Sequence, residues 1–224
     1  MDGNGRWAEA RGLARLAGHE AGADAVRAIT TRARERGVES LTLYAFSTEN
    51  WQRPKDEVRG LWTLLVRFLK GELKTLLDND IRLQLLGDAG GIPSLAKASL
   101  NRVMARTASG SGMTLNLALN YGAKAELLRA VNQLKDEPGP IDEDRLEASL
   151  DTAGQAPVDL LIRTGGERRL SNFLLWQAAY AELLFTDCLW PDFDAAAFDA
   201  ALADFAGRER RFGRTGAQLR EEQP

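Results

Sequence analysis

Five short apolar runs, separated by stretches with helical periodicity, constrain the fold of this chain more than any other feature of its sequence. Each run is bounded by polar residues or glycine. Short, nearly continuous apolar strands are typical of a parallel sheet that helices cover on both faces. The predicted strands span residues 40–46, 81–86, 113–120, 160–163 and 183–185. We therefore expect an α/β fold, a single domain with a central, mostly parallel sheet flanked by helices.

The segments between these runs have the residue spacing of amphipathic helices. We predict helices at residues 18–36, 54–79, 94–107, 124–134, 142–150, 172–179 and 195–211. The longest pattern, residues 54–79, has a broad apolar stripe and a proline near its first turn. This stripe is expected to pack against the sheet, to line an apolar tunnel, or to do both with different edges.

The composition limits the classes of function. The formal net charge is -3, which argues against a nucleic-acid binder because affinity for a phosphate backbone needs an excess of Lys and Arg. The single cysteine, Cys188, excludes an internal disulfide. No signal-peptide pattern begins the sequence, and no apolar stretch approaches the ~20 residues that cross a bilayer. We expect a cytoplasmic protein.

The first candidate site has two glycines, an asparagine and an arginine next to a carboxylate. Its residues are Asp2, Gly3, Asn4, Gly5, Arg6 and Trp7. Glycines let backbone N–H groups approach an anion closely, and a helix that starts behind them favours negative charge. A carboxylate repels a phosphate unless a cation lies between them, so Asp2 predicts a magnesium ion here. An ordinary turn before a helix is the alternative interpretation.

A second polar cluster directly follows the predicted strand at residues 40–46. It contains Ser47, Thr48, Glu49, Asn50, Trp51, Gln52 and Arg53. Ligands of open parallel sheets bind at the carboxyl ends of the strands, so this loop lies where a site is expected. The alternative is a capping turn into the next helix, with Arg53 or a neighbour as the cap. The two roles are compatible.

A third cluster, residues 163–172, follows the predicted strand at 160–163. It combines paired glycines with three arginines and a serine, among them Arg163, Arg169 and Ser171. Guanidinium groups form forked hydrogen bonds with phosphate oxygens, so the cluster predicts a diphosphate site. Solvated surface arginines are the alternative. Glu182, a single carboxylate farther along, is by itself typical of a half-exposed loop acid.

Blocks that cover almost the whole chain, in order, closely resemble the cis-prenyltransferase family, and its bacterial undecaprenyl diphosphate synthases in particular. They are residues 1–7, 18–19, 46–54, 163–177 and 189–193. The resemblance implies a transferase that adds isopentenyl diphosphate units to an allylic diphosphate primer, expected to be farnesyl diphosphate. The implied product is a long cis-polyprenyl diphosphate, expected to be undecaprenyl diphosphate for the cell-wall lipid carrier. A homodimer and an elongated apolar tunnel are also implied.

The resemblance further implies roles for individual residues. Asp2 is expected to hold Mg²⁺ and, with Asn50, to be catalytic, and Glu182 is expected to add a metal ligand from the same or the partner subunit. The expected ligands of the allylic diphosphate are Gly3, Asn4, Gly5, Arg6 and Arg15. Those of isopentenyl diphosphate are Arg163, Arg169 and Ser171. The other expected substrate-binding residues are Trp7, His19, Ser47, Thr48, Glu49, Trp51 and Arg53.

The remaining expectations concern the product and the ends of the chain. Asn50, Ser47 or a diphosphate oxygen is expected to help remove the proton, and a lipid product is compatible with peripheral membrane contact for its release. The growing chain is expected to contact Ala45, Leu61, Trp62, Leu65, Leu85 and Leu115. We predict a catalytic domain at residues 1–213, ending in a segment that approaches the neighbouring subunit (residues 211–213), and a polar tail at 214–224.

One family feature and two rival functions complete the analysis. Family members have a short apolar strand that runs into the Met-Asp-Gly motif, so that strand either precedes the given residues or is missing from the sheet. A catalytically silent scaffold subunit would have lost the metal and diphosphate residues, which are present here. A nucleotide-binding enzyme would show a Gly-x-x-x-x-Gly-Lys-Ser/Thr loop or a strand-linked Gly-x-Gly-x-x-Gly, and this sequence has neither.

Overall fold

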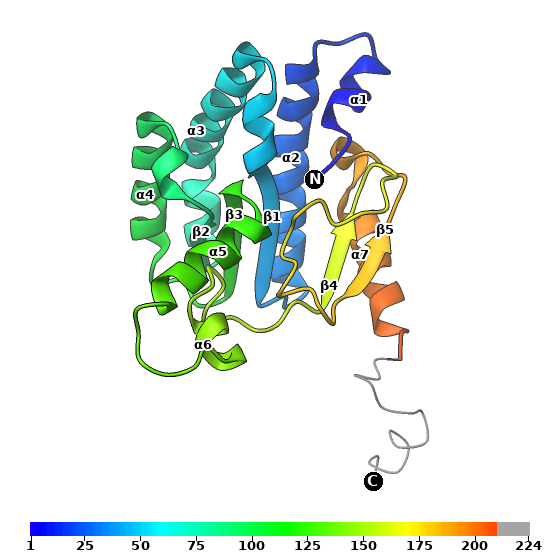
Figure 1. The fold of residues 1–224 in the computed structure, drawn as a ribbon. Coiled ribbons are helices and arrows are strands. Elements are labelled where there is room, and N and C mark those ends of the chain that lie inside the picture. Colours follow the sequence, from blue (N-terminus) through cyan, green and yellow to red (C-terminus); the bar gives the residue numbers. More distant parts are fainter. Residues whose placement is uncertain (210–224) are drawn as a thin grey trace.

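In the computed structural model, which describes residues 1–209, helices surround two sets of parallel strands (Figure 1). The first sheet has the order β1-β3-β2 and the second pairs β4 with β5. The strands are β1 (Ser40–Ser47), β2 (Ile81–Leu86), β3 (Met113–Tyr121), β4 (Leu160–Arg163) and β5 (Glu182–Phe185). Every ladder in the described part is parallel. The predicted α/β fold is confirmed, with its strands divided between two hydrogen-bonded sheets.

The helices follow the predicted order, apart from α1 and the segment at residues 172–179. They are α1 (Asn4–Glu9), α2 (Arg15–Glu35), α3 (Lys55–Asp78), α4 (Ser94–Thr107), α5 (Ala123–Leu134), α6 (Glu143–Ala148) and α7 (Ala195–Ala206), with short 3-10 turns η1 (Thr48–Gln52), η2 (Ala89–Gly91) and η3 (Trp190–Asp192). Within residues 1–209, no helix is long and apolar enough to cross a membrane. The last residues of the helix predicted at 195–211, the segment 211–213 and the predicted tail lie outside the described residues.

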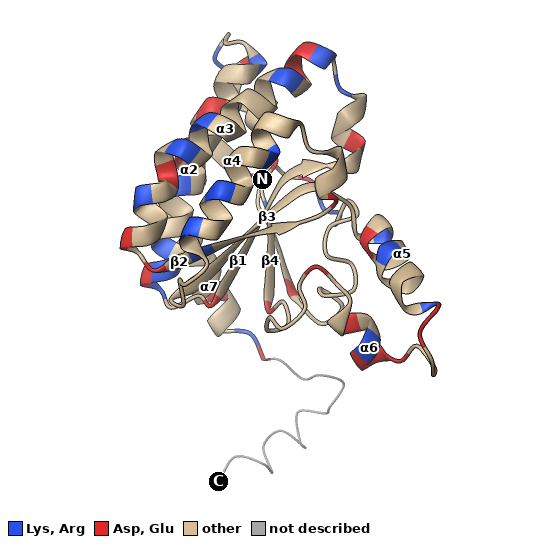
Figure 2. Cartoon of the chain, turned by 90° about the vertical axis from the view of Figure 1, so that its left-hand side faces the viewer, with Lys and Arg blue, Asp and Glu red and all other residues tan. Residues whose placement is uncertain are grey.

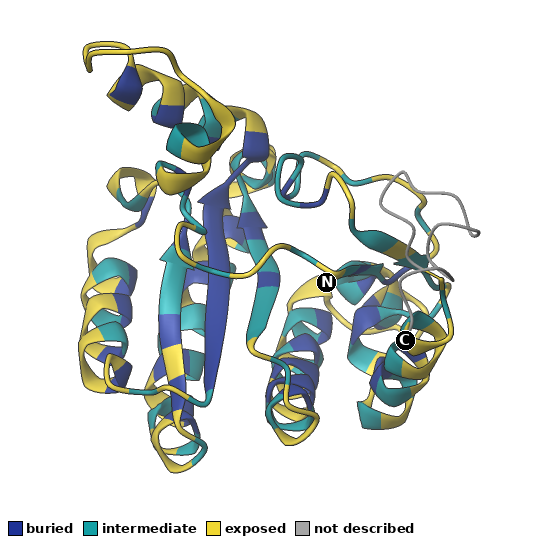
Figure 3. Cartoon of the chain, turned by 90° about the horizontal axis from the view of Figure 1, so that it is seen from below, coloured by how far each residue is buried: buried dark blue, intermediate teal, exposed yellow. Residues whose placement is uncertain are grey.

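Strand β3 is the buried centre of the larger sheet. All nine of its residues are buried, and Figure 3 shows this strand in dark blue between its neighbours. Burial on both faces explains why its sequence is a nearly continuous apolar run. Of its two buried amide side chains, that of Asn116 donates hydrogen bonds to Ser40, Thr42 and Gln155, at 3.0, 3.1 and 2.7 Å. These bonds remove the cost of burying a polar group in the core.

Helices α2, α3 and α4 cover one side of this sheet with their apolar faces. From α3, the side chains of Val58, Trp62, Leu69 and Leu76 are buried in the same core as strands β1 and β3. Charged residues lie along the outer surface of these helices (Figure 2). The broad apolar stripe of α3 therefore packs against the sheet, as expected for an amphipathic helix.

The predicted helix at residues 172–179 is wrong, because this segment consists of turns. Ser171, Asn172 and Leu174 have positive φ angles of 50°, 62° and 44°, which an α-helix cannot contain. Asn172 is held from two sides. Its carbonyl and side-chain oxygens accept from the backbone N–H groups of Ala123 and Lys124, and its side-chain nitrogen donates to Glu49. These long-range bonds override the helical pattern of the local sequence.

Close packing between α1 and α2 depends on glycine. A Cβ atom at Gly18 would lie 1.9 Å from the carbonyl oxygen of Asn4, and one at Gly22 would lie 2.2 Å from the side-chain oxygen of Asn4. Both distances are far below van der Waals contact. The two glycines therefore let the first turn of α1 lie directly against α2, and this contact fixes the position of the residues that precede and begin α1.

We expect Gly18→Ala to lower the free energy of unfolding by about 2 kcal/mol or more, because the new methyl group meets a backbone oxygen that cannot move aside easily. Gly71→Ala in α3 is the matched control, since a Cβ atom there meets nothing within 4 Å. The control should stabilise the protein by up to about 1 kcal/mol, the difference in helix propensity. Urea denaturation of both variants measures the two values. Equal changes in the two variants would contradict this account of the α1–α2 contact.

Candidate active site

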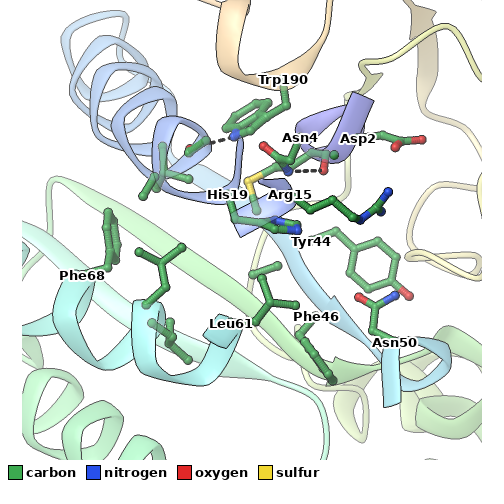
Figure 4. Close-up of a pocket in the computed structure, with 18 of the residues that line it drawn as sticks. Asp2, Asn4, Arg15, His19, Tyr44, Phe46, Asn50, Leu61, Phe68 and Trp190 are labelled. Atoms are coloured by element: carbon green, nitrogen blue, oxygen red, sulfur yellow. Dashed lines mark hydrogen bonds between the residues drawn. The ribbon is translucent and has the colours of Figure 1, made fainter. Parts of the chain in front are cut away.

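A cavity of about 250 Å³ lies between the first residues of the chain, α2, α3 and the end of β1 (Figure 4). Polar groups line one part of it: Asp2, Asn4, Arg6, Arg15, His19, Asn50 and Arg53. Apolar side chains line the rest: Met1, Ala23, Val26, Ala45, Phe46, Leu61, Trp62, Leu64, Leu65, Phe68, Leu117, Leu119 and Trp190. In Figure 4, Asp2, Arg15 and Asn50 lie on one side of the cavity and Phe68 on the other. The cavity thus suits a ligand with a charged head and an apolar tail.

Asp2 is fixed through its backbone at the carboxyl end of β4. Its N–H donates to the Thr164 hydroxyl at 2.9 Å, the same hydroxyl donates to the Asp2 carbonyl at 2.9 Å, and Trp190 N–H also donates to that carbonyl at 3.0 Å. The backbone position of Asp2 is therefore set by two residues far away in the sequence. This leaves its side chain to interact with the arginines around it.

Two arginines face the Asp2 carboxylate. Arg163 Nη2 donates to one oxygen at 3.0 Å, and Arg6 Nη2 lies 3.3 Å from the other. Burial alone would raise the pKa of Asp2, but the hydrogen bond from Arg163 and the two positive charges outweigh it and lower the pKa. Asp2 therefore stays ionised at neutral pH, which both an ion pair and metal binding require.

The third predicted cluster forms a loop around Arg163. The Nη1 atom of Arg163 donates to the Ser171 hydroxyl at 2.7 Å and to the carbonyl oxygen of Arg169. Gly165 and Gly166 have φ angles of +85° and +79°, values that favour glycine. Arg6 Nη1 also donates to the Gly165 carbonyl at 2.7 Å. These bonds place the Arg163 loop beside Asp2, although Arg163, Arg169 and Ser171 do not line the cavity itself.

The residues around Asp2 fit one particular mode of magnesium binding. Magnesium commonly binds one or two carboxylates and the phosphates of a substrate while it keeps several waters. Asp2 supplies one carboxylate, 39% exposed, next to groups suited to phosphate. Within residues 1–209 no three His, Cys, Asp or Glu side chains are grouped to hold a metal by themselves. The chain therefore offers a partial site that a substrate diphosphate would complete.

Within one chain, Glu182 lies at the other end of the β4–β5 ladder from the residue that contacts Asp2. It pairs with Leu160 at the start of the β4–β5 ladder, whereas Arg163, which contacts Asp2, pairs with Phe185 at the other end. Three residues along a strand span about 10 Å and place side chains on opposite faces. The Glu182 carboxylate instead lies 3.0 Å from Arg208. The register therefore does not favour a role for Glu182 in the Asp2 site of its own chain.

Glu57, which the sequence analysis missed, does not line the cavity but contacts three residues of its polar part. Its carboxylate is 13% exposed and lies 3.1 Å from Arg53, 3.5 Å from His19 and 3.6 Å from Arg15. Burial and the charge of Arg53 lower the pKa of His19, so its ring is neutral at pH 7. Glu57 lies four residues after Arg53 at the start of α3, and this spacing on a helix is the signal that could have identified it.

The second predicted cluster divides into residues with different contacts. Ser47 and Asn50 cap η1 reciprocally, with Ser47 N–H donating to Asn50 Oδ1 at 3.1 Å. At the start of α3 the N-cap position is Pro54, next to Arg53, and no side chain caps this helix. Asn50 and Arg53 line the cavity. Trp51 donates to Asn120 at 2.7 Å, outside the cavity lining. The expected residues that do not line the cavity are Trp7, Ser47, Thr48, Glu49, Trp51, Arg163, Arg169, Ser171 and Glu182.

Trp7 and two of the expected chain-binding leucines lie away from the cavity. Trp7 donates to Asp192 at 2.7 Å, and the Arg11 guanidinium lies 4.1 Å from the centre of its ring. Leu115 is 1% exposed in the core of the sheet, and Leu85 packs at its edge. The other apolar residues expected to contact the growing chain do line the cavity, namely Ala45, Leu61, Trp62 and Leu65.

Comparisons with known proteins agree with this geometry. Residues 1–213 match the model of a prenyltransferase family described as putative undecaprenyl diphosphate synthase. The chain is 50% identical to proteins of Escherichia coli (strain K12) and Salmonella typhimurium (strain LT2) that are named farnesyl-diphosphate-specific ditrans,polycis-undecaprenyl-diphosphate synthases. Each match covers 96% of this chain and 88% of the relative.

Two solved structures show the same fold. Lavandulyl diphosphate synthase from Lavandula x intermedia, solved with dimethylallyl diphosphate, is 34% identical with a TM-score of 0.93 over 96% of this chain and 95% of its own. A probable undecaprenyl diphosphate synthase from Campylobacter jejuni is 34% identical with a TM-score of 0.80 over 87% of this chain and 92% of its own. With its cavity and with these similarities along nearly its whole length, the chain belongs to the undecaprenyl diphosphate synthase family of prenyltransferases.

Proposed function

We propose that this protein condenses isopentenyl diphosphate units onto farnesyl diphosphate to give undecaprenyl diphosphate, the precursor of a cell-wall lipid carrier. The observation that carries the proposal is the cavity, whose apolar part ends in an arginine-rich part beside Asp2. A diphosphate with an isoprenoid tail has this distribution of charge. The names of relatives that are 50% identical over 96% of the chain support the same substrate.

The two diphosphates occupy neighbouring positions in this proposal. The allylic primer places its tail among the apolar side chains of α2 and α3 and its diphosphate near Arg6, Arg15 and the backbone N–H groups of the first turn of α1. Those N–H groups have no acceptor within the helix. Isopentenyl diphosphate lies near Arg163, Arg169 and Ser171. The hydrogen bonds that join Arg163 to Asp2 and Arg6 to Gly165 hold the two positions together.

Condensation breaks the C1–O bond of the allylic diphosphate, and both electrons of that bond remain on the departing diphosphate. The electron pair of the isopentenyl double bond forms the new bond to C1. A proton then leaves the added unit, and the nearby departing diphosphate accepts this proton. Arginines and backbone N–H groups stabilise the developing negative charge. Magnesium bound at Asp2 would supply further charge neutralisation on the diphosphates.

The proposal includes a homodimer, in which Glu182 adds a metal ligand to the partner subunit's site. The distance along the β4–β5 ladder between Glu182 and Arg163, the residue that contacts Asp2, supports this assignment. We further propose a cytoplasmic enzyme that contacts a membrane only when its lipid product leaves.

Asp2→Asn should lower the turnover number by about 100-fold or more, because it removes a charged ligand from the site where negative charge develops. Incorporation of labelled isopentenyl diphosphate onto farnesyl diphosphate, with and without Mg²⁺, measures this. Chromatography of the dephosphorylated products gives their chain length. Asp78→Asn, at the far end of α3, is the control and should keep the wild-type rate. A wild-type rate in the Asp2 variant would contradict the role of this carboxylate.

Arg169→Ala should raise the KM for isopentenyl diphosphate by about tenfold or more, with little change in the KM for farnesyl diphosphate, since a charged hydrogen bond to one substrate is lost. Arg15→Ala should show the reverse. Initial rates with each substrate varied in turn provide both constants. The opposite pattern would show that the two diphosphate positions have been exchanged.

Mixing two inactive variants tests the dimer. If Glu182 serves the partner subunit's site, a heterodimer of Asp2→Ala and Glu182→Ala chains contains one intact site. Random reassociation of equal amounts should then restore about a quarter of the wild-type activity, because half of the dimers are mixed and each has one working site. If Glu182 serves its own chain, the mixture should be as inactive as its components. Wild type denatured and refolded in the same way is the control.

A further inference from the structure

An irregularity in β1 turns consecutive side chains toward the cavity. Tyr44 pairs with Ala118 and Phe46 pairs with Leu119, so Ala45 is an extra residue in the ladder with β3. Side chains of a regular strand alternate between its two faces. Here Tyr44, Ala45 and Phe46 all line the cavity. Bulges of this kind redirect side chains and are frequent beside active sites.

The Tyr44 ring is held in one orientation. It stacks on Phe173 with ring centres 4.5 Å apart and planes 12° apart, and it meets Tyr121 edge to face at 5.9 Å and 83°. Its hydroxyl donates to the Tyr121 carbonyl oxygen at 3.2 Å. Burial, together with the charge of Glu49, raises the pKa of Tyr44 well above its usual value. The side chain is therefore neutral and is no candidate for a general base.

The ring lies at the boundary between the two proposed diphosphate positions. On one side it contacts Phe173, two residues after Ser171 in the loop proposed to bind isopentenyl diphosphate. On the other side it lines the cavity proposed to hold the allylic primer, where Figure 4 shows it between Arg15 and Asn50. Because Phe173 covers one face of the ring, the ring can border the cavity only with its other face or its edge. The new carbon–carbon bond must form at this boundary.

We propose that Tyr44 is a catalytic residue whose ring face stabilises the positive charge that develops on the isoprenoid carbons during condensation. The inference rests on the proposed function. Positive charge appears first on the allylic C1 as its bond to oxygen breaks, and then on C3 of the added unit after that unit's double-bond electrons form the new bond. Loss of a proton from C2 of that unit returns the electron pair as a new double bond. The face of an aromatic ring attracts cations, most strongly where water is excluded.

Fluorination of the ring tests this charge effect separately from size and shape. Tyr44 is replaced by Phe, and then by phenylalanine with one, two and three ring fluorines. The hydrogen bond of the Tyr44 hydroxyl is absent from all of these variants. Along the series, only the negative charge of the ring face decreases. The single-turnover rate of the first condensation should fall stepwise, by about thirtyfold over the series, as expected for a desolvated cation–π contact. The KM for isopentenyl diphosphate and the thermal midpoint should stay nearly constant.

The same series at Phe173 is the matched control. Phe173 belongs to the same stack, but it does not line the cavity. Its fluorinated variants should all react at one rate. Equal rates across the Tyr44 series, or an equally steep fall in the Phe173 series, would overturn the charge role and leave Tyr44 a packing residue. A wild-type protein that forms no product would overturn the proposed function itself, and this inference with it.

Discussion

Parallel pairing of β1 and β2 with the buried strand β3 is the constraint on which the rest of the structure depends. Parallel strands cannot be joined by tight turns, so each connection must cross back over the sheet, and here helices make those crossings. The carboxyl ends of these strands then lie at one edge of their sheet, where Ser47 ends β1. Arg163 ends β4 of the second sheet, and a hydrogen bond from Asn172 to Glu49 joins the polar clusters that follow β1 and β4, although more than 100 residues separate them in the sequence.

The charges in the site are balanced before any substrate binds. The arginines that we propose to bind diphosphate are paired with carboxylates: Arg6 and Arg163 with Asp2, Arg169 with Glu167, and Arg15 with Glu57. An incoming diphosphate must replace some of these pairs. Partly exposed ion pairs contribute only about 0–1 kcal/mol each, so the exchange costs little compared with a charge-assisted bond to phosphate. These carboxylates also keep a cluster of like charges from repelling one another.

Local patterns in the sequence predicted the strands to within a residue or two and all helices but the short α1 and the segment at 172–179. They could not predict that segment because bonds to Ala123, Lys124 and Glu49 decide its conformation, and those partners are distant in the sequence. Motifs placed Asp2, Arg6, Arg15 and Asn50 at the cavity. Glu57 was missed because an acid in the first turn of a helix has an ordinary explanation in the helix dipole. The separation of Glu182 from Asp2 follows only from the strand register.

The long sequence separation of the Asp2 contacts has a consequence for biosynthesis. Asp2 is held by Thr164, 162 positions away, and by Trp190. A ribosome adds about 5–20 residues per second, so this carboxylate emerges many seconds before its partners exist. The sheet around β3 can form while translation continues, whereas the edge that carries Asp2 can close only after Trp190 has been made. Until then Asp2 lacks Thr164 and Trp190, the two residues that hold its backbone, and Arg163, which donates to its carboxylate.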